Sequence, residues 1–319
     1  MLLDHAAPPA LLDDAGREPE AVSRWGAASE TGELTDVLLC APAFLELVPC
    51  NSVSRDSIGK GLLSSPSLAA RQHHALAAAL EQNGVRCHFV PPARGLADLC
   101  FTRDAVLTSP WGLVELRPAA SHRRAEPGLV AQAAAALGVP LFDRIVEGSI
   151  EGGDVCLLRE GLLLVGQSGD RTDARGARAL GALFERRGWE VIHTRFDRRF
   201  LHLDTLFTMV SGDCAVACSA VLEDDLLATL GRLGIGIIPA SVEEVVSLGA
   251  NLLSLGKARV VAPAGNDRLN SILASAGLEV IAVELDQFTR CGGGAHCLTM
   301  PLARQEHGGS SSNRLPRSK

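Results

Sequence analysis

The chain repeats one pattern of secondary structure about every fifty residues, and this repeat limits the folds that it can adopt. Two β-rich runs joined by a short turn begin near residues 105, 154, 206 and 251, so successive starts are 49, 52 and 45 residues apart. Each pair is followed by a segment of helical period and then by a single apolar run, as in 105–118, 127–138 and 139–145. A period of this length predicts a repeated supersecondary unit rather than one doubly wound sheet.

A fifth unit forms only if the two ends of the chain come together. The apolar runs 35–42 and 297–302 would pair as its hairpin, with a helix at 71–84 and a strand at 85–92. The sequence therefore predicts an α/β fold, a five-bladed α/β propeller of β-β-α-β units with the helices outside and the hairpins facing a central channel. A closed ring of this kind leaves no free sheet edges.

The domain boundaries follow from the ends of this repeat. We expect one catalytic domain over residues 33–304. Residues 1–32 are polar and weakly patterned, which predicts a flexible extension. Residues 305–319 have the low apolar content of a disordered tail.

Composition excludes several classes of protein. A net charge of −7 argues against a protein that follows the phosphates of nucleic acid. No window approaches about 18 uninterrupted apolar residues, and the N-terminus lacks the basic and apolar regions of a signal peptide, so we expect a cytoplasmic protein without a membrane span. The nine cysteines show no regular framework and no CxxC pair, which favours reduced thiols and predicts no metal site.

Four polar motifs lie at equivalent positions of successive units, next to the hairpins. Each motif alone has a structural explanation, such as a capped turn or an exposed loop. Their shared phase in the repeat places all of them at the central channel. The motifs are FTRDAV (101–106), IEGGDV (150–155), LHLDTL (201–206) and GGGAHCLT (292–299).

The ordered set TRD, EGGD, HLD and GGGxHCxT resembles the guanidine-modifying enzymes of the pentein fold. These include arginine deiminase, dimethylarginine dimethylaminohydrolase and the amidinotransferases, and the resemblance covers roughly residues 35–303. It implies a cysteine nucleophile and no cofactor. Other schemes fit less well, because the chain has no GxSxG elbow for a serine nucleophile and no GK[ST] after its glycine run for a phosphate loop.

The resemblance assigns roles that suit the chemistry of a guanidinium group. Cys297 would attack the guanidinium carbon, His202 would protonate the departing nitrogen and later activate water, and Glu151 would orient His202. Asp104 and Asp204 would hold the guanidinium nitrogens by forked hydrogen bonds. The resemblance also implies substrate contacts from Asp98, Arg123, Arg171, Asn51 and Gly294.

The substrate is less clearly indicated, because the motifs resemble different members of the superfamily. The compact length is similar to that of the dimethylarginine enzymes. Two residues differ from the pattern of those enzymes, which usually carry an acid where this chain has Arg103 and a non-acidic residue where it has Asp204. HLD resembles arginine deiminases and amidinotransferases, and an acid at 204 favours a substrate with an unmethylated guanidinium end. Asn51 lies in a loop that resembles one used by arginine dihydrolases.

Three functions remain open on the sequence. The first is a hydrolase that acts on arginine or a methylated arginine and releases citrulline or ornithine with ammonia or an alkylamine. The second is an amidinotransferase, in which an amine takes the amidino group. The third is a non-enzymatic binding protein of the same ring fold. We expect a small guanidino compound as partner and allow for a homodimer.

Overall fold

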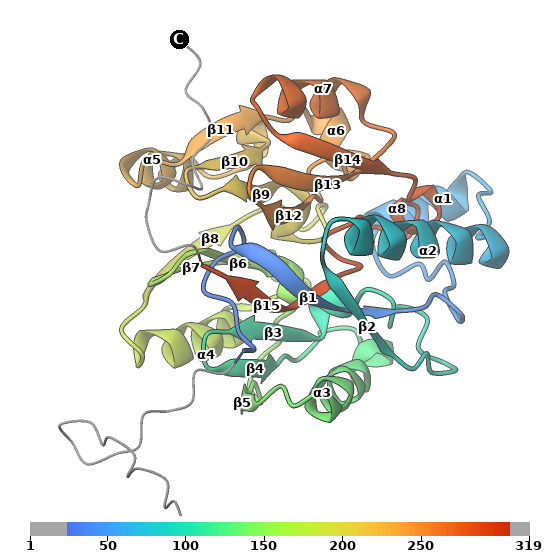
Figure 1. Cartoon of the computed structure of the whole chain (residues 1–319), viewed down its shortest axis with the longest axis horizontal. Helices are drawn as coiled ribbons and strands as arrows, with labels where there is room; N and C mark the ends of the chain where they lie inside the picture. Colours follow the sequence, from blue (N-terminus) through green and yellow to red (C-terminus); the bar gives the residue numbers. More distant parts are fainter. Residues whose placement is uncertain (1–23, 307–319) are drawn as a thin grey trace, which may run out of the picture.

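Five small sheets surround a central axis, and each has three strands (Figure 1). The computed structural model describes residues 24–306 of the 319. In each sheet two antiparallel strands form the hairpin and a third runs parallel to the middle strand. Four sheets come from consecutive segments: β3 (Val106–Ser109), β4 (Gly112–Glu115), β5 (Leu141–Arg144); β6 (Val155–Arg159), β7 (Leu162–Gln167), β8 (Glu190–Arg195); β9 (Phe207–Ser211), β10 (Cys214–Ala217), β11 (Gly236–Pro239); β12 (Leu253–Gly256), β13 (Arg259–Pro263), β14 (Glu279–Val283).

The fifth sheet joins the two ends of the described chain, as the sequence predicts. Strand β1 (Glu33–Cys40) pairs antiparallel with β15 (Met300–Gln305), so that Leu38 lies opposite Met300. On its other side β1 runs parallel to β2 (Arg86–Val90). This pairing closes the ring, and the predicted five-bladed α/β propeller is confirmed.

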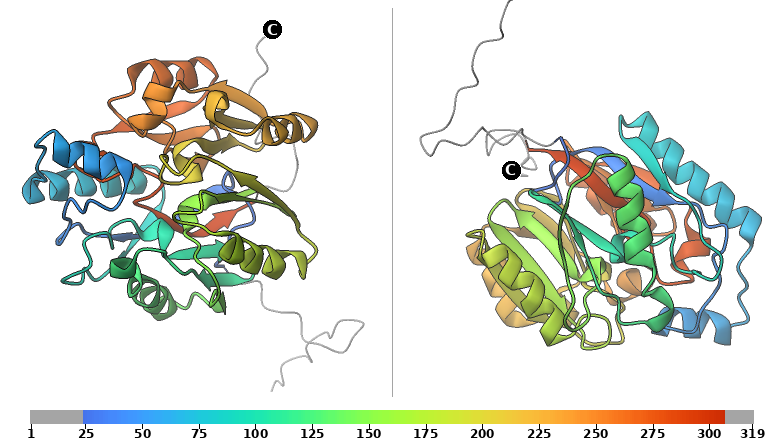
Figure 2. Two further views of the ribbon diagram at one scale, coloured as in Figure 1. Left: turned by 180° about the vertical axis from the view of Figure 1, so that it is seen from behind. Right: turned by 90° about the horizontal axis from the view of Figure 1, so that it is seen from below.

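Helices cover the outside of the ring (Figure 2). Each middle strand is thus enclosed between a helix and the interior: Leu163 and Leu164 of β7 are both fully buried, although they point to opposite faces. The third strands lie farther out and are half-exposed. The connecting helices are α2 (Pro66–Gln82), α3 (Glu126–Ala136), α4 (Ala174–Glu185), α5 (Asp224–Arg232) and α7 (Asp267–Ser275).

Three short helices lie outside the repeat and were not expected: α1 (Ser52–Gly59), α6 (Val242–Val246) and α8 (Asp286–Thr289). The first two begin with capping boxes, in which the side chain of the N-cap residue accepts from a backbone N–H three residues later. Among residues 24–306, no helix combines the length and apolar character needed to cross a membrane.

The N-terminal boundary differs from the prediction, because residues 24–32 pack against the ring. Trp25 is 6% exposed and Glu30 is 5% exposed. Gly26 donates its N–H to the carbonyl of Leu302, and Glu30 donates its own to Leu157. This segment is too short to show a periodic pattern, so sequence periodicity could not reveal it. The rest of the predicted extension, and the predicted tail from residue 307, lie outside the described residues; β15 continues through Gln305.

Candidate active site

The four predicted motifs occupy equivalent short turns, each of them before one of the five hairpins. Three of them form single 3-10 turns, η1 (Thr102–Asp104), η3 (Gly152–Asp154) and η4 (Leu203–Thr205). Each turn precedes the first strand of its sheet, and neighbouring turns lie in contact. The repeat therefore brings polar residues that are about fifty positions apart to one end of the channel.

Cys297 lies between the glycine run and β15, and it is 2% exposed. Its Sγ lies 3.4 Å from Asp204 Oδ2 and accepts a hydrogen bond from Asn251 Nδ2 at 3.2 Å. Burial raises the pKa of the Cys297 thiol to about 12, and the negative charge of Asp204 adds to the rise, while a hydrogen bond with His202 opposes it. The thiol therefore keeps its proton near neutral pH unless a positive charge nearby offsets the negative charge of Asp204.

His202 is fully buried and forms a charged pair with Glu151. Its Nε2 lies 2.8 Å from Glu151 Oε2. Its Nδ1 faces Asp104 Oδ1 at 3.7 Å and has no hydrogen-bond partner among the described residues. The Gly153 Cα lies against the imidazole, since a Cβ added there would come within 2.7 Å of the ring. One nitrogen of His202 is thus fixed and the other is available for proton transfer.

The charges around His202 keep it protonated. Burial acts to lower the pKa of His202, but the carboxylates of Asp104 and Asp154 and the hydrogen bonds with Cys297 and Glu151 outweigh it and hold this pKa well above its usual value. Burial likewise acts to raise the pKa of Glu151, and the hydrogen bond to His202 reverses this, giving about 2. The pair is therefore an imidazolium and a carboxylate near neutral pH.

Asp104 is already held by groups of the protein. Its Oδ2 accepts from Arg123 Nη1 at 2.7 Å, and its Oδ1 accepts from the backbone N–H of Gly153 at 3.2 Å. Arg123 also donates to Glu126 Oε2 at 2.9 Å and to the carbonyl of Phe101 at 3.1 Å. The Arg123 guanidinium thus lies among the acids of the site, and the substrate contact that the resemblance implies for it stays a prediction.

Asp204 has one oxygen bound and one oxygen without a partner. Oδ2 accepts from His296 Nδ1 at 2.7 Å, and Oδ1 is buried with no hydrogen-bond partner among the described residues. His296 Nε2 in turn lies 3.5 Å from Glu30 Oε2, and Glu30 also contacts Arg103 Nη1 at 3.3 Å. A chain of buried charged groups therefore runs from Asp204 to the N-terminal segment.

Asn251 completes the set, and sequence reasoning missed it. It is fully buried, and its Oδ1 accepts from the N–H groups of Gly294 at 2.9 Å and of Cys297 at 3.2 Å. Asn251 lies two residues before β12, the place that the other motifs take before their own hairpins. Its position in the repeat was the signal that could have found it. His296, next to Cys297, was also not selected.

The glycine run before Cys297 is explained by close packing. Gly292 has a φ of +104°, which favours glycine. A Cβ on Gly293 would lie 2.3 Å from the ring of Phe101, and one on Gly294 would lie 2.9 Å from Asn251 Oδ1. These glycines let the loop that carries Cys297 approach Phe101 and Asn251 closely.

The remaining predicted residues line one narrow cavity of about 20 Å³ together with Cys297 and Asp104. Arg171 donates to the carbonyl of Cys50 at 3.0 Å and contacts Glu151 at 3.5 Å. Asn51 caps α1 and donates to the carbonyl of Cys291 at 2.9 Å. Asp98 lies in the same wall.

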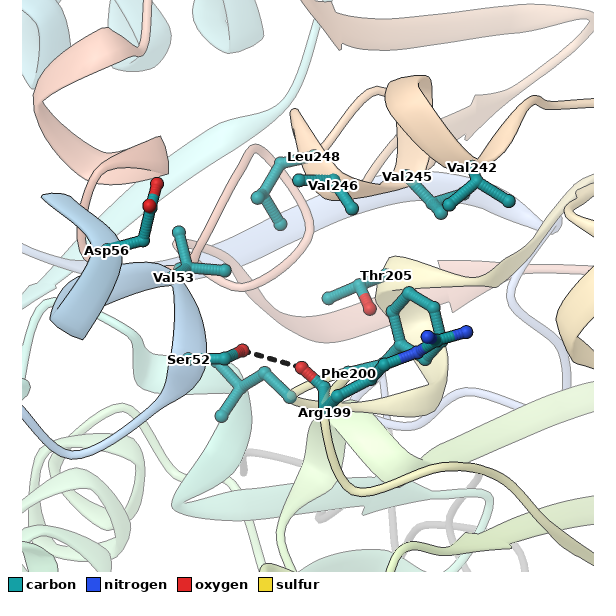
Figure 3. A pocket seen from close by; sticks show the side chains of 12 residues that line it. Ser52, Val53, Asp56, Arg199, Phe200, Thr205, Val242, Val245, Val246 and Leu248 are labelled. Atoms are coloured by element: carbon teal, nitrogen blue, oxygen red, sulfur yellow. Dashed lines mark hydrogen bonds between the residues drawn. The ribbon is translucent and has the colours of Figure 1, made fainter.

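A larger apolar cavity of about 320 Å³ adjoins this one (Figure 3). The two cavities share Leu201 and Gly292 in their walls. Valines of α6 line one side, and Ser52 of α1 donates to the carbonyl of Arg199 at 2.5 Å on the other. The narrow cavity is polar and the larger one is aliphatic.

Comparison with known proteins assigns the chain to a family. The family model described as N,N dimethylarginine dimethylhydrolase, eukaryotic, matches residues 50–304. An uncharacterized protein of Bacillus subtilis, YkgA, is 28% identical over 289 residues, which is 90% of this chain and 98% of its own. The N(G),N(G)-dimethylarginine dimethylaminohydrolase of Pseudomonas aeruginosa is 27% identical over 248 residues, which is 77% of this chain and 93% of its own.

Solved structures share the ring. The N-terminal domain of ArgZ, a cyanobacterial arginine dihydrolase, aligns with a TM-score of 0.75 at 22% identity, over 85% of this chain and 98% of its own. At that identity the likeness concerns the fold alone. The family match over most of the chain goes further: the chain belongs to the N,N-dimethylarginine dimethylhydrolase family of eukaryotic type, within the guanidine-modifying pentein superfamily.

Proposed function

We propose that the protein hydrolyses a guanidinium C–N bond through a covalent amidino-cysteine at Cys297. One observation carries the proposal: a thiol, an imidazolium–carboxylate pair and two further carboxylates are buried together, and the thiol and Asp104 line one narrow cavity. The acids suit a cation, and the thiol and imidazole suit covalent transfer. Membership of a family that contains hydrolases of guanidino groups supports the same activity.

The first half-reaction follows from the charges. A substrate guanidinium held by Asp104 and Asp204 offsets the carboxylate charge that holds the Cys297 proton, so the thiol ionises to the solvent. The thiolate attacks the guanidinium carbon and forms a C–S bond. His202, as imidazolium, gives its proton to the departing nitrogen as the C–N bond breaks, and the amine leaves.

The second half-reaction restores the enzyme. Neutral His202 now takes a proton from a water molecule as that water attacks the amidino carbon. As the C–S bond breaks, the remaining hydroxyl proton passes to the departing sulfur, so the carbonyl forms, the thiol is restored, and His202 is an imidazolium again. Glu151 keeps its charge throughout and holds Nε2 of the ring. With arginine as substrate, one turn gives citrulline and ammonia.

We propose arginine, with its unmethylated guanidinium end, as the preferred substrate. Asp204 Oδ1 is a buried acceptor next to Cys297 and lacks a donor among the described residues. An N–H of an unmethylated terminal nitrogen would satisfy it. Two methyl groups would instead leave this carboxylate oxygen buried without a hydrogen-bond donor. The missing hydrogen bond alone costs about 1–3 kcal/mol, and the burial of an unpaired charge adds to that cost.

A dimethylated arginine is the second candidate, and the family match favours it. Incubation of the protein with arginine, monomethylarginine and asymmetric dimethylarginine, followed by mass spectrometry of products, separates the candidates. Citrulline from arginine supports the proposal, and ornithine would mean that two nitrogens are removed. Turnover only with an added amine acceptor would indicate a transferase. No turnover of any of these guanidines would favour the third hypothesis, a non-enzymatic binding protein of the same fold.

A further inference from the structure

The amide side chain of Asn251 is fully buried, and both of its polar atoms have hydrogen-bond partners. Its Oδ1 accepts from the backbone N–H of Gly294 at 2.9 Å and from that of Cys297 at 3.2 Å. Its Nδ2 donates to the carbonyl of Asp204 at 3.3 Å and to Cys297 Sγ at 3.2 Å. Turning the amide over would place its N–H groups against two backbone N–H groups, so its orientation is fixed. Asn251 therefore presents a donor to the sulfur.

The turn that carries Asn251 is itself firmly held. Leu248 has a φ of +62°, a backbone conformation that residues other than glycine rarely adopt and that persists where the surroundings impose it. Asn251 donates its own N–H to the carbonyl of Leu248 at 3.1 Å. Thr208 Oγ1 donates to the carbonyl of Ala250 at 2.7 Å, and residues 248–251 are all buried. The amide is thus placed in advance of any reaction.

The acids around the sulfur make such a donor necessary. Sγ lies 3.4 Å from Asp204 Oδ2, and the negative charges of Asp204 and Asp104 act with burial to raise the pKa of the Cys297 thiol, while His202 opposes them. When the thiol ionises, its contact with Asp204 Oδ2 loses the proton between the two atoms and becomes repulsive. The hydrogen bond from Asn251 instead becomes charge-assisted and stronger.

We propose that Asn251 is a further catalytic residue, whose Nδ2–H stabilises the Cys297 thiolate as it attacks the guanidinium carbon. The same hydrogen bond stabilises the negative charge that develops on sulfur when the C–S bond breaks in the second half-reaction. Asn251 keeps its protons throughout. The part in turnover rests on the proposed function, whereas the stabilisation of the thiolate does not.

Two variants of Asn251 separate its donor from its acceptor. Asn251→Leu removes the donor without adding a charge, and it also removes the contacts with the loop. Asn251→Asp keeps an acceptor oxygen for both backbone N–H groups and puts a second oxygen in place of the donor. Thr208→Val is the matched control, because Thr208 holds the same turn through the carbonyls of Ala250 and Asp204 and makes no hydrogen bond to the sulfur.

The reactivity of the thiol reports its ionisation directly. The full-length protein, without substrate, would be treated with iodoacetamide between about pH 7 and 10, and alkylation of the peptide that contains Cys297 would be followed by mass spectrometry. Below the pKa of the thiol, this rate is proportional to the fraction of thiolate. A hydrogen bond to a charged group is worth about 10–100-fold in such an equilibrium.

We expect Asn251→Leu to be alkylated about 10–100-fold more slowly than wild type at each pH, and Asn251→Asp more slowly still. Thr208→Val should stay within about threefold of wild type. The kcat/KM for arginine should fall in the same order. A purely structural role predicts the opposite for alkylation, because a loosened loop exposes the thiol to the reagent.

Alkylation of Asn251→Leu at the wild-type rate or faster would overturn the proposal. If thermal unfolding shows that this variant does not fold, the same result with Asn251→Asp would overturn it. Slower alkylation with an unchanged kcat/KM would remove Asn251 from the reaction and leave the proposed function intact. Iodoacetamide needs no guanidine, so a wild-type protein without turnover would refute the proposed function and not the effect of Asn251 on the thiolate.

Discussion

His296 Nδ1 lies 2.7 Å from Asp204 Oδ2, and this contact joins the residue before Cys297 to the carboxylate two positions after His202. It fixes the rotation of Asp204, so that Oδ1 is the oxygen without a partner. The same Oδ2 lies 3.4 Å from Cys297 Sγ. Asp204 therefore lies against the Cys297 thiol with one oxygen fixed and one available for a donor.

Replacing Asp204 should change which guanidine is preferred. Asp204→Ser removes the acceptor that an unmethylated nitrogen would satisfy, so kcat/KM for arginine should fall by about 10–100-fold, as for loss of a hydrogen bond to a charged group. The loss for asymmetric dimethylarginine should be smaller. Asp213→Asn, in the turn of the same hairpin, is the control. A wild-type preference of about tenfold or more for the dimethylated substrate would refute this argument.

Replacing the nucleophile should stop turnover without unfolding the protein. Cys297→Ser keeps the shape of the side chain, but a hydroxyl ionises far less readily than a thiol, so no amidino adduct can form at a useful rate. Wild-type protein quenched during turnover should show the adduct on the peptide that contains Cys297. Cys214→Ser, on a half-buried cysteine of β10, should remain active. Robust turnover by Cys297→Ser would exclude the covalent mechanism.

The ring could be predicted from the sequence because its units repeat. Apolar runs mark middle strands that are buried on both faces, and the joining of 35–42 to 297–302 followed from closure of the ring. The polar motifs were recognisable for the same reason, since each occupies the same turn before a hairpin. The periodic part of the structure is therefore the part that the sequence reveals.

What escaped prediction depends on contacts across the channel. Glu30 lies in a short segment without a pattern, and only the closed ring brings it to Arg103 and His296. Asn251 belongs to no recognisable motif, although it makes hydrogen bonds with Sγ and the backbone N–H of Cys297 and with the backbone N–H of Gly294. The rotamer of Arg123, which pairs with Asp104, is likewise a property of packing that no spacing in the sequence encodes.

Substrate affinity should depend on Asp104. Asp104→Asn removes one charge that would face the guanidinium in a buried site, and loss of one partner of such a pair costs about 2–5 kcal/mol. Substrate affinity from equilibrium binding to the Cys297→Ser background should fall accordingly. Glu115→Gln, whose partner Arg144 is exposed, serves as the control in the same blade. A loss below about threefold, under 1 kcal/mol, would remove Asp104 from the substrate site.

The pair of Glu151 and His202 should make stability depend on pH. The pKa of Glu151 is about 2 in the folded protein against 4.5, so its stabilisation is present above pH 4.5 and is lost as the pH falls towards 2. The raised pKa of His202 acts in the other direction: its stabilisation is present below pH 6.5 and is lost as the pH rises through its folded value.

Urea unfolding at several pH values tests this dependence. The free energy of unfolding of Glu151→Gln should fall less steeply than that of wild type between pH 4.5 and 2. His202→Asn should lose part of the alkaline decrease. Parallel curves for wild type and Glu151→Gln would show that folding does not lower the pKa of this carboxyl.

The N-terminal segment should contribute to the stability of the ring through Glu30. Its contacts with Arg103 and His296 are buried, and breaking a buried ion pair by removing one partner costs about 3–5 kcal/mol. Glu30→Gln should therefore lower the free energy of unfolding by an amount of that order. Asp56→Asn breaks an exposed pair with Lys60 and should cost at most about 1 kcal/mol. The double variant of Glu30→Gln with Arg103→Gln should cost less than the sum of the single changes, because neither charge is then left buried alone. Strict additivity would mean that residues 24–32 are held by apolar packing of Trp25 and Ala27 and not by this pair.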